Sequence, residues 1–477
     1  MDKNKALSFV LLGTAPFIFA SKPNTHKQPN VLFIIVDDLR TELNCYGNTE
    51  IISPNIDKLA ASGVQFNQAY CNIAASGASR ASLMTGMRPT KYQFLDAFSK
   101  ISVEAPNAIP LPKLFKQKGY TTLSNSKVIH YQKDVPDAWS EIWMPGAYTI
   151  GWRNYLGYEN QKVSFTKQGP DAFECLDVAD NAYYDGMTAE KAINDLQKFK
   201  KSGNPFFLCV GFVKPHLPFN APKRYWDMYP LDKITLPDSY RMDRSTFPSQ
   251  AFWNWDELRF YNKIPDQGPI ESDVEARKLI QGYRACVSYS DAQVGKVMDE
   301  LKRLKLDENT LVVLIGDHGW SLGNHGEWCK WSSFSVVNRT PLIVSGLDIP
   351  SNKKVNKIVE FVDLYPSICE MAGLEIPKQV EGKSFVKLVK ESDDPEWKNA
   401  AVIQNQGGLT YMTPEYRYTE WSDSTNKVVA KMLFDYKNDS NELKNIATDK
   451  KNKKLIELLH NESMKLRGKD YFSKLTQ

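Results

Sequence analysis

Three runs of apolar residues have the pattern of β-strands that are buried on both faces of a sheet. Residues 31–36, 205–212 and 311–315 are almost continuously apolar, contain many β-branched and aromatic residues, and are bounded by polar residues. Such runs are typical of parallel strands that helices cover on both sides. Around them, N-cap signals and helical periodicity predict helices at 53–60, 111–118, 188–201 and 280–306. The pattern predicts an α/β fold with a mostly parallel central sheet flanked by helices.

A change in composition beyond residue 375 indicates a second, smaller unit. The chain becomes rich in Lys there, and its patterns predict strands at 416–421 and 428–434 and a charged helix at 453–467. We therefore expect an N-terminal domain over residues 28–375 and a C-terminal α+β subdomain over residues 376–477.

The N-terminus has the layout of a secretory signal peptide. Two lysines precede the apolar run 6–20, and polar residues follow it. The run is too short, and too interrupted by Gly13 and Pro16, for a membrane span. We expect residues 1–22 to be a signal peptide that directs the chain to the periplasm, and the alternative is a poorly ordered apolar leader. No other stretch of the sequence approaches the length of a transmembrane helix.

Composition and charge are those of an ordinary soluble globular protein of 477 residues. The 60 basic and 56 acidic residues leave a net charge of +4, and we expect no nucleic-acid partner. The seven cysteines are scattered singly, without a Cys-x-x-Cys pair, so neither a zinc site nor a disulfide framework is indicated. We expect the cysteines to be mostly reduced and buried.

Acidic residues follow two of the predicted buried strands. Asp37 and Asp38 come directly after residues 31–36, and Asp317 comes shortly after residues 311–315. If these strands are neighbours, the acids converge at the carboxyl edge of the sheet, where open α/β sheets bind ligands. Carboxylates that lie this close repel one another, and a hard cation with oxygen ligands would relieve the repulsion. The alternative for Asp37 and Asp38 is a helix cap or a turn.

Histidines are concentrated in loops that follow strands. Four of the six, His130, His216, His318 and His325, lie in such loops, and Lys127 precedes His130 by three residues. Packing alone explains this concentration poorly. Lys127 and His130 could face one pocket, or they could simply be surface residues.

Two long stretches, 134–185 and 221–270, lack clear periodicity and predict loops. The second contains many aromatic residues, including Trp253 and Trp255. Their rings could stack on sugars, but covering the edges of the core is the interpretation that we favour.

The stretch 71–89 combines small residues with the start of a helix. Ser76 lies next to the predicted helix N-terminus, where free N–H groups and the helix dipole favour an anion. Arg80, four residues on, adds a planar cation that suits a tetrahedral oxyanion. Taken alone, this spacing favours an N-capped helix that carries a surface arginine.

Residues 76–80 (Ser-Gly-Ala-Ser-Arg) and 83–89 resemble the signature of the sulfatase family. In that family the first signature position is converted after translation into formylglycine, an aldehyde that acts as a hydrated gem-diol. This chain has the serine version, which implies a formylglycine-generating maturase of the radical, anaerobic type. Other runs that match the family are 36–40, 53–57, 127–130, 214–219, 317–320, 325–330 and 416–419.

Across nearly its whole length the chain is similar to sulfatases of the alkaline-phosphatase superfamily, and especially to iduronate-2-sulfatases. The resemblance implies an alkaline-phosphatase-like fold and a calcium ion held by Asp37, Asp38, Asp317, His318 and the modified Ser76. It implies three cations that bind the sulfate and neutralise its charge: Arg80, Lys127 and Lys330. It further implies that His216 contacts the substrate as the general acid and that His130 supports the hydrate.

The substrate that the resemblance implies is a 2-O-sulfate ester on a uronic acid at the non-reducing end of a glycosaminoglycan fragment, such as one from heparin. The uronic acid could be the unsaturated sugar that a polysaccharide lyase leaves. Other linkages and other sulfated polysaccharides are alternatives. So are a phosphatase or phosphonate hydrolase of the same superfamily, with an unmodified hydroxyl and usually two transition metals, and a non-catalytic glycan-binding relative.

Overall fold

The computed structural model describes residues 28–148, 153–163, 169–391 and 393–468. The predicted signal peptide lies outside these ranges. Within them, no helix is long and apolar enough to cross a membrane.

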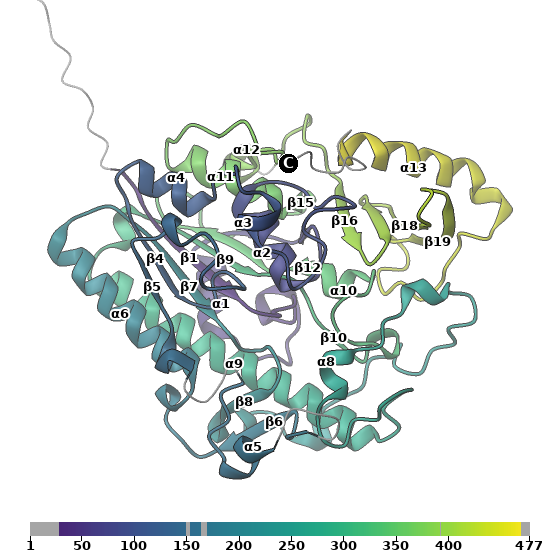
Figure 1. Cartoon of the computed structure of the whole chain (residues 1–477), viewed down its shortest axis with the longest axis horizontal. Helices are drawn as coiled ribbons and strands as arrows, with labels where there is room; N and C mark the ends of the chain where they lie inside the picture. The colour runs from purple at the N-terminus through teal and green to yellow at the C-terminus, as the bar shows by residue number, and fades with distance from the viewer. Residues whose placement is uncertain (1–27, 149–152, 164–168, 392, 469–477) are drawn as a thin grey trace, which may run out of the picture.

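A large, mostly parallel sheet forms the centre of the protein (Figure 1). Strand β1 is its middle strand and pairs in parallel with β7 and β9, while β13 pairs antiparallel with both of its neighbours. The strand order is β14-β2-β13-β9-β1-β7-β4-β5. The bounds are β1 Asn30–Val36, β2 Gly63–Phe66, β4 Thr121–Ser126, β5 Glu141–Trp143, β7 Phe206–Phe212, β9 Thr310–Gly316, β13 Leu342–Ser345 and β14 Lys353–Val355. The predicted fold class is confirmed.

Helices cover both faces of this sheet, which is why its interior strands are apolar on both sides. Alternate residues of β1 enter two separate cores, Leu32 and Ile34 on one face and Phe33 and Ile35 on the other. The first face is covered by α1 (Pro54–Ala61), α6 (Tyr184–Ser202) and α9 (Asp273–Arg303). The second is covered by α2 (Ser76–Thr85), α4 (Leu111–Gln117), α11 (Leu364–Met371) and α12 (Val386–Glu391).

Three helices begin earlier than the sequence predicted, and one of them, α6, starts at Tyr184 rather than at residue 188. Helix α9 starts at Asp273 rather than near residue 280, because the side chain of Ser272 caps it by accepting a hydrogen bond from the Glu275 N–H at 3.3 Å. Helix α2 starts at Ser76 itself, with Ala75 as its N-cap, so Ser76 occupies the first turn. Ser76 is therefore the first residue of the helix rather than a residue of the preceding loop.

Two glycines allow loops to pack directly against the carboxyl ends of the strands. A Cβ at Gly316, the last residue of β9, would lie 2.2 Å from the carbonyl oxygen of Leu39. A Cβ at Gly211 in β7 would lie 2.1 Å from the carbonyl of Lys127. Only glycine permits these contacts, which bring the loops after β1 and β4 close to the same edge of the sheet.

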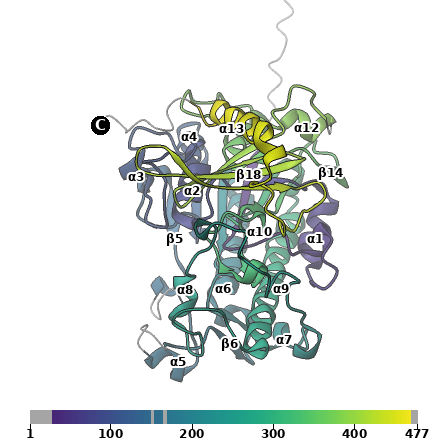
Figure 2. The same cartoon turned by 90° about the vertical axis from the view of Figure 1, so that its right-hand side faces the viewer.

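The C-terminal part forms a separate antiparallel sheet with one covering helix (Figure 2). Its strands are β16 Ala401–Asn405, β17 Gly408–Met412, β18 Tyr416–Ser422 and β19 Val428–Asp435, and the helix is α13 Lys453–Arg467. Ile456 and Leu459 of α13 pack onto one face of this sheet. The predicted C-terminal strands and helix are confirmed, whereas the boundary at residue 375 stays a prediction.

Arg417 of β18 ties this second sheet to residues 333–338, which include the short helix Ser335–Asn338. Its fully buried guanidinium donates hydrogen bonds to the Ser333 carbonyl and, at 2.6 Å, to Asn338 Oδ1. It also forms an ion pair of 2.7 Å with Glu442, whose other oxygen accepts the Ser335 N–H at 2.7 Å. Residues near the C-terminus thus hold the loop that directly follows Lys330.

Small elements complete the fold. The remaining strands are β3 Ala69–Tyr70, β6 Phe173–Leu176, β8 Phe219–Pro222, β10 Ser321–Leu322, β11 Trp328–Cys329, β12 Arg339–Thr340 and β15 Val359–Glu360. The remaining α-helices are α3 Ile101–Glu104, α5 Tyr158–Lys162, α7 Lys223–Trp226, α8 Asp256–Arg259 and α10 Ser335–Asn338. Five of the seven cysteines are buried and all are free, so the expectation for cysteines is confirmed.

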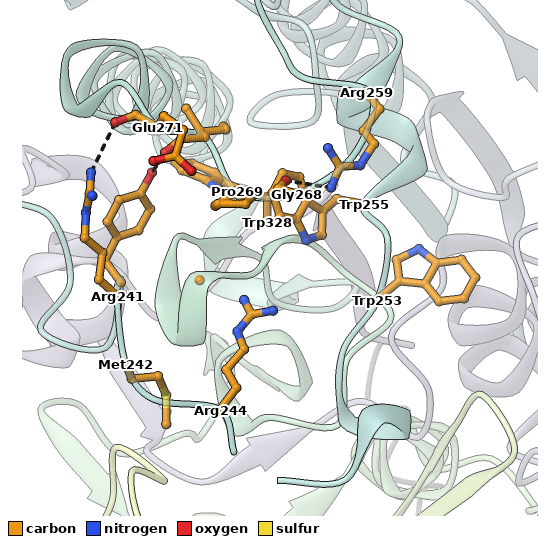
Figure 3. A pocket seen from close by; sticks show the side chains of 13 residues that line it. Arg241, Met242, Arg244, Trp253, Trp255, Arg259, Gly268, Pro269, Glu271 and Trp328 are labelled. Carbon is orange, nitrogen blue, oxygen red and sulfur yellow. Dashed lines mark hydrogen bonds between the residues drawn. The ribbon is translucent and has the colours of Figure 1, made fainter. Parts of the chain in front are cut away.

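The aromatic region 221–270 has two roles. Tyr225, Trp226 and Trp255 are buried in the core beside the sheet, as the sequence predicted. Trp253 is only half-buried, and together with Trp328 it lines a cavity of about 550 Å³ (Figure 3).

Candidate functional site

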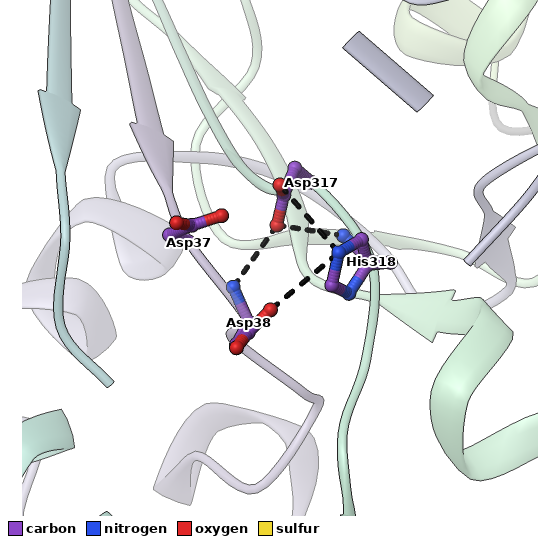
Figure 4. Close-up of side chains that lie close together, drawn as sticks. All are labelled: Asp37, Asp38, Asp317 and His318. Atoms are coloured by element: carbon purple, nitrogen blue, oxygen red, sulfur yellow. Dashed lines mark hydrogen bonds and ion pairs between the residues drawn. The ribbon is translucent and has the colours of Figure 1, made fainter. Parts of the chain in front are cut away.

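The acids that follow β1 and β9 meet at the carboxyl edge of the sheet, as the sequence predicted (Figure 4). The two strands are parallel neighbours with Val36 opposite Gly316, so Asp37 and Asp317 emerge side by side. Oδ1 of Asp317 accepts the N–H groups of Asp38 and His318, both at 3.0 Å. Asp38 has a left-handed backbone, with φ of 61°. These contacts hold three carboxylates and one imidazole in a buried cluster.

Ser76 faces this acidic cluster from the first turn of α2. Its Oγ donates to Asp37 Oδ1 at 3.2 Å and lies 2.9 Å from His318 Nε2. Ser76 is 2% exposed. Ser76 therefore lies beside the acids that follow the two strands, whereas its role as a metal ligand stays a prediction.

Arg80 lies one turn further along α2 and is fully buried. Its Nε donates to Asp317 and its Nη2 to Asp37, both at 2.9 Å, and its Nη1 donates to the carbonyls of Lys127 and Val128. Arg80 therefore fixes two carboxylates and the loop after β4 relative to each other. The direct contact with sulfate that the resemblance implies for Arg80 stays a prediction.

Lys127 and His130 lie in the loop after β4, and their side chains contact each other beside Asp37. Lys127 Nζ is 3.7 Å from Asp37 Oδ2 and 3.2 Å from His130 Nδ1. Burial, with a contribution from the positive charge of Lys127, lowers the pKa of His130 to about 2. His130 is therefore neutral, and its Nδ1 accepts the hydrogen bond from the lysine.

His216 and Lys330 both lie next to Asp38. Lys330 Nζ is 3.0 Å from Asp38 Oδ1, and His216 Nε2 is 3.9 Å from Asp38 Oδ2. Burial lowers the pKa of His216 to about 4, although the carboxylate of Glu257 opposes this shift. Asp38 and Glu257 raise the pKa of Lys330 above its usual value in spite of burial, so the lysine is charged.

Glu257 of the short helix α8 is a site residue that the sequence analysis missed. Its Oε1 lies 3.0 Å from His216 Nε2, and its Oε2 lies 3.5 Å from Lys330 Nζ. Glu257 comes from a region without periodicity, and no motif marks it. The one local feature is an alternation of Trp253, Trp255 and Glu257, and it does not indicate that Glu257 contacts His216 or Lys330.

The cluster fits a bound cation. Carboxylate atoms of Asp37, Asp38 and Asp317 and a ring nitrogen of His318 all lie within 4.8 Å of one another. Ligands about 2.3–2.6 Å from a calcium ion lie at most about 5 Å apart on opposite sides of it. Oδ2 of Asp37 is buried without a hydrogen-bond partner among the described residues. Three carboxylates with one imidazole form an oxygen-rich set that suits a hard divalent ion.

The electrostatics of the acids agree with this fit. Burial raises the pKa of Asp38 well above its usual range, the nearby carboxylates of Asp37 and Glu257 raise it further, and Lys330 offsets only part of the effect. Burial acts in the same direction on Asp37, but Lys127 and Arg80 lower its pKa well below the usual range. Asp38 thus lacks sufficient positive charge nearby, which a divalent cation would supply.

Comparisons with known proteins agree with this arrangement. The family model of the sulfatases matches residues 29–374, and a model described as "N-sulphoglucosamine sulphohydrolase, C-terminal" matches residues 323–469. The chain is 36% identical to iduronate 2-sulfatase of Mus musculus, over 82% of this chain and 84% of that protein. A structure described as a 2-O GAG sulfatase has a TM-score of 0.72 and 22% identity, covering 94% of both chains. Phosphonate monoester hydrolase of Agrobacterium radiobacter has a TM-score of 0.77 and 18% identity, covering 94% of this chain and 98% of that one.

The last two matches show the fold alone, because both are below 25% identity. The fold and the matched family define a hydrolase of sulfuric esters. The chain belongs to the sulfatase family.

Proposed function

We propose that the protein is an exo-acting carbohydrate sulfatase that removes a 2-O-sulfate from a uronic acid of glycosaminoglycan-type oligosaccharides. The observation that carries this proposal is the 36% identity with iduronate 2-sulfatases over most of the chain. The geometry around Ser76 supports it, because the signature serine lies against the acids that fit a cation.

The nucleophile in this proposal derives from Ser76. Converted to formylglycine and hydrated, residue 76 would supply the attacking oxygen. The contacts of Oγ with Asp37 and His318 direct the side chain into the acidic cluster, and burial excludes water from the surroundings. Among the described residues, the imidazole recorded within hydrogen-bond distance of the unmodified Ser76 hydroxyl is that of His318, which also belongs to the proposed metal ligands.

Asp37, Asp38, Asp317, His318 and residue 76 would hold a calcium ion. The ion would polarise a sulfate oxygen and lower the pKa of the attacking hydroxyl. The residues of this chain supply the rest of the charge: Arg80 holds Asp37 and Asp317 in place, and we infer that it also faces the ester. Lys127, beside Asp37, and Lys330, beside Asp38, would neutralise charge that develops on the sulfate oxygens.

His216 would donate the proton that the leaving sugar oxygen needs. Its Nδ1 lies 2.6 Å from the Leu217 carbonyl, which fixes the ring and leaves Nε2 as the atom that carries the transferred proton. The negative charge of a bound sulfate ester would raise the pKa of His216 and favour its protonated form. His130, held by Lys127, would orient the hydrate from the other side.

The main alternatives are a different sulfated polysaccharide or linkage, and a phosphatase or phosphonate hydrolase of the same superfamily. The phosphonate hydrolase match concerns the fold and does not separate these chemistries. Among the described residues, one acidic cluster fits a metal ion, whereas the two-metal phosphatases of this superfamily need a second set of ligands. We therefore favour sulfate esters.

The proposal includes export and maturation. Residues 1–22 would direct the chain to the periplasm, and a radical-type maturase would convert Ser76 before the enzyme acts on sulfated oligosaccharides. Serine at this position, rather than cysteine, is the basis for the anaerobic type of maturase.

Peptide mass spectrometry across Ser76, on protein from its native host, tests the chemistry. The expected result is the loss of two hydrogen atoms at Ser76. Sulfate release is then compared between a disaccharide with 2-O-sulfated unsaturated uronate and its isomer with the sulfate on the 6-position of glucosamine. We expect release from the first only. Release from phosphate monoesters by protein with unmodified Ser76 would instead establish the phosphatase alternative.

A further inference from the structure

A cavity lies between the region 240–271 and the hairpin of β10 and β11. Its volume of about 550 Å³ falls within the range of small-molecule pockets. Figure 3 shows that its walls combine indole rings with guanidinium groups. The aromatic lining includes Trp253, Trp255 and Trp328, and the cationic lining includes Arg241, Arg244 and Arg259.

Arg259 and Arg244 differ in how many of their guanidinium N–H groups are bonded to protein acceptors. Arg259 stacks at 3.9 Å on the ring of Trp255 and donates to the carbonyls of Pro265 and Gly268, so it has a structural role. Arg244 donates through Nη2 to the His325 carbonyl at 2.6 Å and pairs with Glu327 at 3.1 Å. Within the described part of the chain, no protein acceptor bonds Nε or Nη1 of Arg244. These donors are available to an anion in the cavity.

An aromatic pair lies between the cavity lining and the segment that carries Lys330. The ring of Trp253, which lines the cavity, lies 6.3 Å from the ring of Trp331. Trp331 directly follows Lys330, the proposed sulfate-binding lysine, and both tryptophans are half-buried. The backbone N–H of Trp253 donates to the buried carboxylate of Glu327 at 2.9 Å, which fixes the position of the pair. The cavity is thus linked through the Trp253–Trp331 ring pair to the residue that follows Lys330 in the chain.

The backbone at Trp331 is strained. Its φ is 78°, in the left-handed region that bulky side chains rarely adopt, and Cys329 has φ of 65°. Such a conformation is typical of functional segments. With this backbone conformation, two consecutive residues contact different parts of the protein: Lys330 lies against Asp38, and Trp331 lies against Trp253.

We propose that Trp331, Trp253 and the cavity form a subsite for the saccharides on the reducing side of the sulfated uronate, and that Arg244 binds a sulfate or carboxylate of those saccharides. This inference rests on the proposed function, which it extends from the cleaved residue to the length and charge of the oligosaccharide. Indole faces suit the C–H faces of sugar rings, and a guanidinium suits planar or tetrahedral oxyanions. The enzyme therefore prefers oligosaccharides with a charged second unit.

Kinetics on substrates of increasing length test the subsite. The substrates are the 2-O-sulfated unsaturated uronate monosaccharide and a tetrasaccharide with the same non-reducing end. We expect wild-type kcat/KM to be at least about tenfold higher for the tetrasaccharide, and Trp253→Ala to lower this ratio about tenfold. Trp253→Phe keeps an aromatic face and recovers most of the ratio. Equal effects of Trp253→Ala on both substrates, or no effect on either, overturn the proposal.

Charge recognition is tested with Arg244→Gln on two tetrasaccharides that differ only in a sulfate on the second unit. The variant is expected to lose the preference for the sulfated form, and an unchanged preference contradicts the role of Arg244. Controls are Arg303→Gln and Tyr158→Ala, which remove an exposed arginine and an exposed tyrosine outside the cavity and keep the wild-type ratios.

Direct binding separates failure of the subsite from failure of the proposed function. Calorimetry measures tetrasaccharide binding to Ser76→Ala and to Ser76→Ala with Trp253→Ala. Weaker binding by the double variant supports the subsite even if the wild-type enzyme releases no sulfate from these sugars, which would refute the proposed substrate instead. Equal binding by both variants refutes the subsite.

Discussion

Glu257→Gln is expected to slow catalysis without weakening substrate binding. The carboxylate of Glu257 bridges His216 Nε2, at 3.0 Å, and Lys330 Nζ, at 3.5 Å. We infer that Glu257 is a positioning residue: it orients the imidazole that protonates the leaving group and the ammonium that binds the sulfate. Glutamine has the same shape but no charge, so both contacts lose their charge assistance.

The size of the effect follows from these contacts. A hydrogen bond to a charged group contributes about 1.5–3 kcal/mol, and the Glu257 side chain is 25% exposed, which favours the lower half of this range. Since 1.36 kcal/mol corresponds to a tenfold change in rate, kcat should fall about 10- to 50-fold. KM should not rise, because the substitution removes a negative charge beside the site that binds an anionic ester.

The assay is steady-state sulfate release, with thermal unfolding as the test for an intact fold. Glu257→Asp keeps the charge on a shorter side chain, and we expect it to recover part of kcat. Glu275→Gln, on the first turn of α9, is a matched control with wild-type kinetics. A Glu257→Gln enzyme with kcat within twofold of wild type, or with a raised KM and unchanged kcat, would refute this reasoning.

Further predictions concern the nucleophile, the metal and an ion-pair network away from the site. Ser76→Ala abolishes turnover and leaves the unfolding temperature near that of unmodified wild type; residual activity near wild type would exclude formylglycine. Chelation of divalent ions abolishes sulfate release and lowers the unfolding temperature, Ca²⁺ restores both, and full activity in the chelated protein would contradict the metal site. Burial alone would raise the pKa of Glu360, but Arg88 and Lys398 lower it to about 2, so its ionised form stabilises the fold above pH 4.5 and loses that effect as the pH falls towards 2. Glu360→Gln is therefore expected to lower the free energy of unfolding by about 3 kcal/mol at pH 7, with a deficit that shrinks below pH 4.5 in denaturant titrations, whereas a deficit independent of pH would refute the assignment.

The central sheet and the acidic cluster could be predicted because both follow from local patterns. Continuous apolar runs identify interior parallel strands, and residues after parallel neighbours must meet at one edge. Asp37, Asp317 and Lys127 were found in this way, and the structure places them together. The resemblance to sulfatases added roles that spacing could not provide.

Contacts that depend on irregular segments could not be predicted. Glu257 lies on a helix of four residues within a long aperiodic region, so its approach to His216 depends on tertiary packing alone. The orientation of Arg80 is similar: its position in the signature was clear, but its bonds to two carboxylates and two carbonyls require the folded sheet edge. The left-handed backbone of Trp331 could not be predicted either, because the residue at this position is not a glycine.

The burial of Ser76 sets the order of two processes, the conversion of this serine and the folding of the chain. A modifying enzyme must take the serine into its own active site, and in the folded protein that side chain is 2% exposed behind an acidic cluster. The proposed conversion must therefore come before folding is complete. The segment after Lys330 is anchored by Arg417 and Glu442, which are synthesised late. This segment can therefore reach its final position only after residue 442 has been synthesised. Maturation and folding then compete in time, and a molecule that folds first stays inactive for as long as it stays folded.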